Sequence, residues 1–370
     1  MLNRIIRIMA TAAGCALLLA GCSLRLDNPA LEMAQDTGVP ISFYAGSALL
    51  LYDAQQTKAE YYDDSSFGVF AFKQSGGNWS QLNSKKWKPD FMFNQEVHHS
   101  SGAYTYAPTR YWPNAAVNTL TFWAYSPYDA NVDLLVKGST SNAYTSTSVG
   151  LPDIRFTADG QTDLLYSDVE ADQTYMTNSG TVQFDFNHAL ALVDIKAEKI
   201  DEDGLYGVTM KEVSFKGIYA TGILKNSTAS PASPTTPAWS WDNYSGGRHD
   251  LPVWEDDPLD NSDDVVLAHG TATPLAGVMP LPQDLTNDAC WLHVEFEVSY
   301  HEDPLDPSSA VLSYTTSRNV YLRDVFYSVG SAWAKNTHYT VTLQISPDRP
   351  IQFTVSWDDW GADHNYHLSS

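Results

Sequence analysis

The sequence predicts an all-β protein built as β-sandwiches. Short runs in which apolar residues alternate with polar ones recur along the chain, as expected for strands that bury one face. No window longer than about ten residues carries an apolar stripe with the helical period of 3.6 residues. Clusters of Gly, Pro, Asn, Asp and Ser separate the apolar runs, as turns separate strands.

The N-terminus has the three zones of a secretory signal. Arg4 and Arg7 are basic, an apolar run extends from residue 8 to residue 20, and Gly21 is small. The run is too short for a membrane-spanning helix, which needs about 20 apolar residues. We therefore predict that residues 1–21 are a signal peptide, removed during export.

The four residues Leu19-Ala20-Gly21-Cys22 resemble the bacterial lipobox, in which the cysteine is lipidated and becomes the mature N-terminus. Each buried methylene of an acyl chain contributes about 0.8 kcal/mol, so several chains hold a protein stably at a membrane. Residues 22–40, interrupted by Pro29 and Pro40, are predicted to be the lipidated tether. The alternative is an ordinary secretory signal without lipid.

The predicted strands begin near Ile41, and the clearest two lie at the end of the chain. There the apolar residues of 339–345 alternate, and those of 351–357 repeat the pattern after a proline-bounded turn, so we expect successive strands. Residues 225–264 are rich in Ser, Pro, Asp and Trp and too long for a hairpin turn, which predicts an exposed insertion. The other predicted strands are marked by Phe67, Val69 and Ala71; Leu120, Phe122 and Ala124; Val182, Phe184 and Phe186; Val213 and Phe215; and Val294, Phe296 and Val298.

Charge and cysteine content restrict the partners and the source of stability. The chain has 44 acidic and 21 basic residues, a formal net charge of −23, which disfavours binding to nucleic acid and favours solubility outside the cell. Cys15 leaves with the signal peptide and Cys22 is lipidated. Cys290 therefore has no partner for a disulfide, and we predict a small buried side chain there.

Catalytic and nucleotide-binding motifs are absent from the sequence. It has no Gly-x-Ser-x-Gly, no His-Glu-x-x-His, no Cys-x-x-Cys and no phosphate-binding glycine loop. A pair of carboxylates for glycoside hydrolysis stays open, because so many acidic residues always offer some pair. We predict no catalytic residue, no cofactor and no metal.

Four features offer weaker alternatives. For His98-His99, an exposed pair of surface residues is the preferred interpretation and metal binding is the alternative. For His188, a hydrogen-bonded structural role is preferred and catalysis is the alternative. One loop is crowded with aspartates, and a solvated acidic loop is the preferred interpretation, with calcium binding as the alternative. These aspartates are Asp256, Asp257, Asp260, Asp263 and Asp264. Trp239, Trp241 and Trp254 suit a platform for sugars or, preferably, a core.

Several segments, taken in order, resemble the fimbrillin family of the Bacteroidales, the lipoprotein subunits of type V pili and their accessory proteins. The resemblance spans most of the mature chain. The segments include Phe67-Gly68-Val69-Phe70-Ala71-Phe72, Leu120-Thr121-Phe122-Trp123-Ala124-Tyr125, Asp163-Leu164-Leu165-Tyr166, Phe186-Asn187-His188-Ala189-Leu190 and Val278-Met279-Pro280-Leu281-Pro282.

The resemblance implies two tandem transthyretin-like β-sandwich domains, which we place at residues 41–190 and 191–370. It also implies an outer-membrane or fimbrial location and assembly with other subunits by β-strand addition. In such pilins a trypsin-like protease cuts after Arg or Lys, the first strand leaves, and a neighbour's C-terminal strand replaces it. Here the candidate strand is 41–52, with cleavage after Lys58; the rival site, Arg25, would release only the lipid.

The C-terminal tail departs from what a stalk subunit needs. After Trp360 only Tyr366 and Leu368 have the phase of a donor strand, although residues 351–357 could swing out instead. We therefore expect a tip or accessory subunit that presents loops to a host or microbial surface ligand. The alternative is a surface lipoprotein that binds glycan or a host ligand without polymerising.

Overall fold

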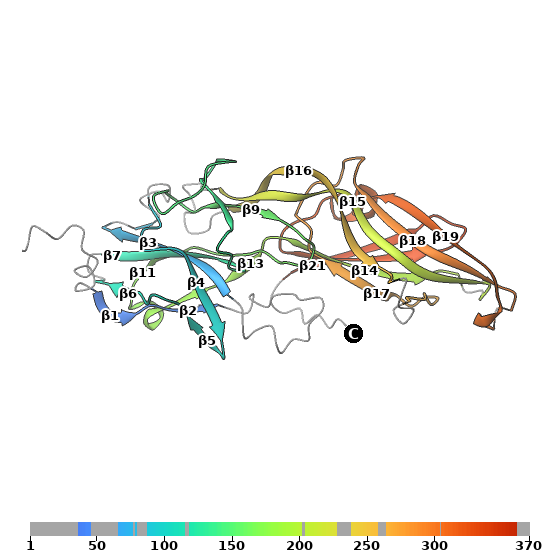
Figure 1. Ribbon diagram of the computed structural model, residues 1–370, viewed down its shortest axis with the longest axis horizontal. Coiled ribbons are helices and arrows are strands. Elements are labelled where there is room, and N and C mark those ends of the chain that lie inside the picture. Colours follow the sequence, from blue (N-terminus) through green and yellow to red (C-terminus); the bar gives the residue numbers. More distant parts are fainter. Residues whose placement is uncertain are drawn as a thin grey trace, which may run out of the picture.

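The computed structural model describes residues 36–45, 66–76, 78–79, 87–114, 118–201, 204–227, 238–257, 264–303 and 305–360 (Figure 1). Within these residues the regular secondary structure is almost entirely β-strand, which confirms the predicted fold class. The helical segments are three or four residues long, and none that the structure describes could cross a bilayer. They are η5 (Thr177–Gly180), η6 (Pro307–Ser309), α3 (Leu322–Val325) and η7 (Tyr327–Val329).

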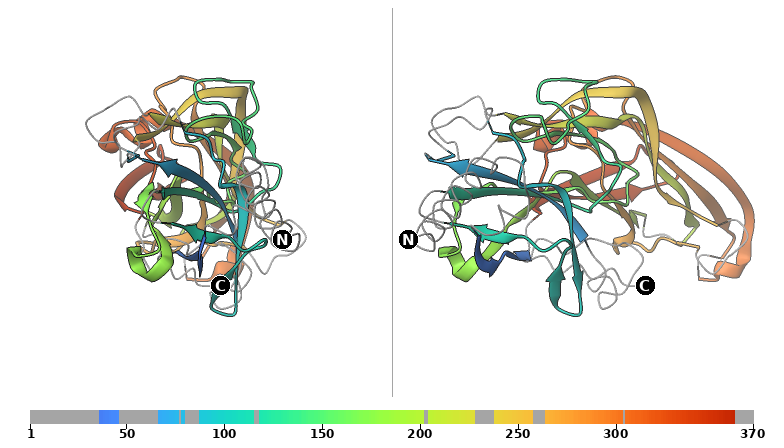
Figure 2. Two further views of the ribbon diagram at one scale, coloured as in Figure 1. Left: turned by 90° about the vertical axis from the view of Figure 1, so that its left-hand side faces the viewer. Right: turned by 60° about the vertical axis from the view of Figure 1, so that its left-hand side comes forward.

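The molecule is elongated, with the earliest described strands at one end and the hairpin of β18 and β19 at the other (Figures 1 and 2). The first end contains a seven-stranded sheet and two small two-stranded sheets. The seven strands are, across the sheet, β13 (Phe186–His188), β10 (Leu165–Ser167), β7 (Asn118–Ser126), β3 (Ser66–Ser75), β4 (Met92–Ser100) and β5 (Ala103–Thr105), with β11 (Glu170–Gln173) also paired to β7. The small sheets pair β1 (Asp36–Pro40) with β6 (Tyr111–Pro113), and β2 (Ser42–Ala45) with β12 (Thr181–Phe184).

The other end contains a four-stranded and a six-stranded sheet. Across the smaller sheet lie β17 (Thr273–Val278), β14 (Ala191–Lys199), β20 (Thr337–Ile345) and β21 (Gln352–Asp359). Across the larger lie β19 (Ala310–Tyr321), β18 (Trp291–His301), β15 (Tyr206–Ser227), β9 (Asp153–Thr157) and β8 (Asp133–Leu135), with β16 (Ala238–Glu255) also paired to β15. The two predicted C-terminal strands are β20 and β21, and they pair in antiparallel register.

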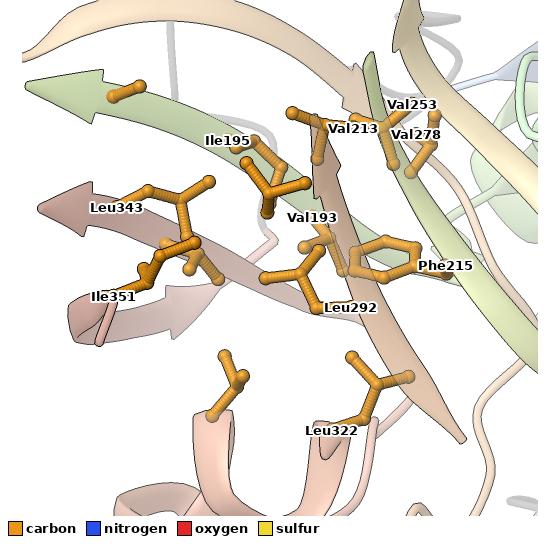
Figure 3. Close-up of a cluster of buried hydrophobic side chains, with 14 of the residues drawn as sticks. Val193, Ile195, Val213, Phe215, Val253, Val278, Leu292, Leu322, Leu343 and Ile351 are labelled. Atoms are coloured by element: carbon orange, nitrogen blue, oxygen red, sulfur yellow. The ribbon is translucent and has the colours of Figure 1, made fainter. Parts of the chain in front are cut away.

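The core between these two sheets is aliphatic with a few aromatic rings (Figure 3). Val193 and Ile195 of β14 and Leu343 of β20 face Val213 and Phe215 of β15, and each is 1% exposed or less. Their alternation with polar residues is the period-two pattern that predicted strands with one buried face.

Strands β3 and β7 differ from that prediction, because both of their faces are buried. Phe67 and Val69 of β3 belong to a core cluster on one side of the sheet, whereas Phe70 and Phe72 belong to a cluster on the other side. β7 divides in the same way, with Phe122 on the first side. Continuous apolar runs such as Phe67–Phe72 are typical of strands covered on both faces. The prediction considered only every second residue of these strands, so it expected one buried face where the structure has two.

The predicted exposed insertion at residues 225–264 is wrong for its central part. β16 occupies Ala238–Glu255 and pairs with β15 from Glu212 to Ser227. The pairing contains four register irregularities, which interrupt the alternation by which a strand is recognised in sequence.

The proposed boundary near residue 190 stays a prediction. The chain passes from β13 to β14 there, from one set of sheets to the other. However, β9, which we placed in the first domain, pairs with β15 of the second. One core cluster also combines Phe70 and Trp123 with Leu224 and Trp239.

Candidate functional site

Strand β2 is a short strand whose side chains fill a core but whose backbone has few partners. Its residues alternate between exposed Ser42 and Tyr44 and buried Phe43 and Ala45. It pairs in parallel with β12 over four residue pairs, and together they form a separate two-stranded sheet outside the seven-, six- and four-stranded sheets. Side-chain burial, more than backbone pairing, therefore holds it in place.

Phe43 makes most of these side-chain contacts. Its ring is 4% exposed and surrounded by aromatic rings of four other segments. The centroid distances are 5.2 Å to Tyr106, 5.9 Å to Phe122 and to Phe184, and 6.5 Å to Phe67. Removing β2 would open an apolar groove lined by these rings.

A few hydrogen bonds fix the backbone beside the groove. The Ile41 N–H donates to the Arg110 carbonyl at 2.9 Å, and the Tyr106 hydroxyl donates to the Ile41 carbonyl at 3.0 Å. Tyr104 donates to the Ala45 carbonyl at 3.3 Å. Burial raises the pKa of both tyrosines, which keeps their hydroxyls protonated and able to donate at neutral pH.

Three carboxyl groups, from Asp168, Glu170 and Asp185, lie next to the end of the β2–β12 pair. Asp185 directly follows Phe184, the partner of Ala45, and its carbonyl accepts from the Asp168 N–H at 3.3 Å. Burial, together with the charges of Asp185 and Asp168, raises the pKa of Glu170 to about 7. Sequence reasoning missed this group, because its members come from separate segments with no motif between them.

A lysine from the distant end of the chain lies beside the same carboxylates. The Lys335 Nζ donates to the Tyr166 hydroxyl at 2.5 Å, and burial lowers the pKa of Lys335 while the Asp168 charge opposes that shift. This contact joins β10 to the segment before β20.

The predicted lipidation and processing residues lie outside the described residues. They are Cys22, Arg25 and Lys58, together with the second half of the candidate strand, residues 46–52. Their roles stay predictions. The tail after Trp360 also lies outside the described residues.

The tryptophans considered as a sugar platform are largely in cores. Trp239 is 4% exposed and stacks on Trp123 at 5.1 Å. The Trp241 Nε1 donates to the Ala189 carbonyl at 2.6 Å, and Trp254 packs against the core cluster that contains Val213 and Phe215. This favours the core interpretation over an exposed platform.

Among the described residues the candidate metal residues do not gather into a site, and no three His, Cys, Asp or Glu side chains there are arranged so that they could hold a metal ion. Asp256 and Asp264 pair instead with Lys211, with 2.6 Å and 3.5 Å between Nζ and the carboxylate oxygens. The His99 ring lies 4.7 Å from the Tyr104 ring. Asp260 and Asp263 lie outside the described residues.

His188 and Cys290 are buried, as the preferred interpretations expected. The His188 Nδ1 lies 2.5 Å from Oδ2 of Asp163, and its ring stacks on Trp360 at 3.7 Å. Cys290 is fully buried and is a free thiol, and burial raises its pKa. Arg248 Nη1 lies 2.9 Å from its sulfur, a contact that the sequence did not predict.

Comparison with solved structures shows the fold. A fimbrial protein from Bacteroides vulgatus superposes with a TM-score of 0.63 at 18% identity, covering 87% of this chain and 99% of that one. A cell adhesion candidate from Bacteroides uniformis gives a TM-score of 0.51 at 14% identity, covering 88% and 100%. At these identities the likeness concerns the fold alone.

Comparison of sequences shows the family. The fimbrium subunit Fim1C of Phocaeicola vulgatus is 30% identical over 233 residues, which are 59% of this chain and 55% of that protein. The chain thus spans about half the length of the curated relative that it matches. The model of the fimbrillin-like family matches residues 57–360, and the chain therefore belongs to that family.

Proposed function

We propose that the chain is a structural and adhesive subunit of a cell-surface fimbria, exported as a lipoprotein and held at the outer membrane through Cys22 before processing. Proteolysis after Lys58 starts its maturation by freeing the first strand; the rival cut, after Arg25, would release only the lipid and leave that strand in place. Loss of the first strand then lets a neighbouring subunit insert its own. The fimbrillin-like family and the fimbrial relatives support this role.

The observation that carries the proposal is the contrast between the side chains and the backbone of β2. Burying a Phe or Ile side chain contributes about 1.5–3 kcal/mol, so an empty groove where Phe43 and Ile41 lay is strongly unfavourable. Only four residue pairs connect β2 to β12. A replacement strand with apolar residues at alternate positions would recover both the burial and the pairing.

The first experiment treats the lipid-free precursor, residues 23–370, with limiting trypsin. Mass spectrometry follows the N-terminus and light scattering follows the size. A cut after Lys58 followed by larger species, or by capture of an added subunit's C-terminal peptide, supports the proposal. In Lys58→Ala this assembly should be absent, whereas in Arg25→Ala it should persist, because a cut after Arg25 leaves the first strand in place. Assembly that persists in Lys58→Ala would contradict cleavage after Lys58. A stable monomer that captures no peptide in any variant contradicts strand exchange.

A reversible lock tests whether the strand must leave. Tyr44 and Gln183 are opposite each other in the β2–β12 register and both are exposed. A disulfide in the double variant Tyr44→Cys, Gln183→Cys should hold β2 after the cut and prevent assembly until reductant is added. Assembly that is equally fast with and without reductant would contradict displacement of β2.

The assignment to a tip or accessory subunit depends on the C-terminal strand. β21 pairs with β20 from Gln352 to Asp359, and Phe353 and Val355 pack against the core. Swinging it out as a donor would break this pairing, so residues 361–370 remain the candidate donor. Deleting 361–370 should leave assembly at the acceptor groove intact. Loss of polymer with a folded monomer would refute the tip assignment.

The alternative is a surface lipoprotein that binds glycan without polymerising. A cavity of about 280 Å³, lined by residues that include Asp159, Tyr219, His249 and Leu281, is the feature that favours it. Glycan arrays with the intact and the trypsin-treated chain separate the two functions. Binding that needs no cleavage, together with a persistently monomeric chain, would support the alternative.

A further inference from the structure

The free edge of β19 is an unusual surface on this acidic molecule. β19 is the outermost strand of the six-stranded sheet, and its described pairing is with β18 on one side only. In Figure 1 it lies at the end of the molecule opposite β1 and β6. Its outer backbone N–H and C=O groups form a template on which another strand can pair.

The composition of β19 favours pairing. Residues 310–317 are uncharged and contain no proline, in a chain whose net charge is −23. Three of their side chains are apolar and strongly exposed: Val311 at 59%, Leu312 at 59% and Tyr314 at 46%. Exposed apolar residues gathered on one strand indicate a protein–protein contact.

Six other edge strands of the three larger sheets carry the usual protection against pairing. β21 ends in two aspartates, β17 contains Pro274, and β5, β8 and β13 are three residues long. β16 contains Pro252 and several register irregularities. Charges, proline, bulges and shortness each discourage edge-to-edge pairing. Before Arg318, β19 has only one of them, a register irregularity at its start between Ala310 and Leu312, and from Leu312 to Ser317 it has none.

We infer that β19 pairs with β19 of a second copy of this chain in an antiparallel, two-fold symmetric contact. The negative net charge of the chain is the reason for placing the contact between two copies on this uncharged strand. Two chains of the same negative charge repel one another over most of their surfaces, so a neutral strip is the place where copies can approach. A cationic partner would instead be drawn to the acidic faces.

The register follows from backbone geometry. In an antiparallel pair only alternate residues of an edge strand direct their hydrogen-bonding groups outward, so two opposing residues must have the same parity. Centring the two-fold axis on Ser313 satisfies this rule. It places Leu312 of each copy opposite Tyr314 of the other, which buries the exposed apolar side chains in aliphatic–aromatic pairs.

This contact leaves the β2 groove free, because β2 and β19 lie at opposite ends of the molecule (Figures 1 and 2). The inference therefore does not depend on strand exchange. It would join subunits laterally or end to end in addition to any assembly through β2.

Cysteine cross-linking tests both the contact and its register in the chain of residues 23–370, in which Cys290 is buried. Ser313→Cys should give a disulfide-linked dimer on mild oxidation, because the two residues face each other across the axis. Ser317→Cys is the matched control: it is an exposed serine on the same face of the strand but distant from its counterpart. Equal cross-linking of the two variants would overturn the register.

Sedimentation over a concentration series tests the association itself. The unmodified chain should form dimers, more readily at higher salt because screening reduces repulsion between acidic copies. Leu312→Lys should weaken the dimer at least tenfold without lowering the melting temperature of the monomer, since Leu312 is mostly exposed. A chain that stays monomeric at millimolar concentration, or a dimer that Leu312→Lys leaves unchanged, would overturn the inference.

Discussion

Phe43 is the residue whose replacement should most weaken the packing of strand β2 against its core. Its ring contacts four aromatic rings, so Phe43→Ala leaves a cavity that the surrounding rings cannot fill. We expect a loss of about 3 kcal/mol in the free energy of unfolding of the uncut chain, measured in urea. The neighbouring Tyr44→Ala, at a side chain 52% exposed, should cost less than about 1 kcal/mol. Equal losses would contradict the burial pattern of β2.

Glu170 should make the fold less stable as pH rises. Burial raises its pKa from 4.5 to about 7 in the folded chain, so the folded state binds this proton more tightly than the unfolded state. The stability contributed by the proton is complete below pH 4.5 and is lost as pH rises through 7. Glu170→Gln should therefore stabilise the protein near pH 8 by about 1 kcal/mol, after discounting for solvent screening of a half-buried group.

The difference between Glu170→Gln and the unmodified chain should vanish near pH 4, where both side chains are neutral. Urea unfolding at three pH values between these limits measures it. Glu96→Gln, which removes an exposed carboxyl on β4, is the matched control. A stabilisation by Glu170→Gln that is the same at every pH would contradict the linkage.

At the scale of elements, β16 is a structural strand whose side chains connect the two ends of the molecule. Trp239→Ala removes a buried ring stacked on Trp123, and we expect a loss of about 3 kcal/mol in unfolding free energy. Trp357→Ala, on edge strand β21 with 61% of the residue exposed, is the matched control and should cost less than about 1 kcal/mol. If the two variants were equally stable, the packing of β16 described above would be wrong.

At the scale of the whole molecule, the shared core predicts cooperative unfolding. One cluster of buried side chains joins Phe70 and Trp123 to Leu224 and Trp239, and β9 pairs with β15 across the proposed boundary. We expect circular dichroism and tryptophan fluorescence to report one coincident transition in urea. Two separate transitions would indicate that residues 41–190 and 191–370 fold independently.

The sequence alone determined the fold class and many of the strands. Alternation along residues 339–345 and 351–357 predicted β20 and β21, because period two follows from the pleat of a strand and needs no partner to be read. The order of apolar segments also predicted the fimbrillin-like family. A strand pattern is a local property of a few neighbouring residues, and the family resemblance is the sum of several such local segments in order.

Only the tertiary structure decided which surfaces are covered. The second buried face of β3, the burial of Trp239 and the grouping of Asp168, Glu170 and Asp185 each depend on contacts between residues far apart in the chain. The free edge of β19 is likewise a matter of sheet order, because the same residues paired on both sides would be an ordinary central strand. Burial and unpaired backbone are properties of neighbours in space, and a linear pattern of residues does not specify those neighbours.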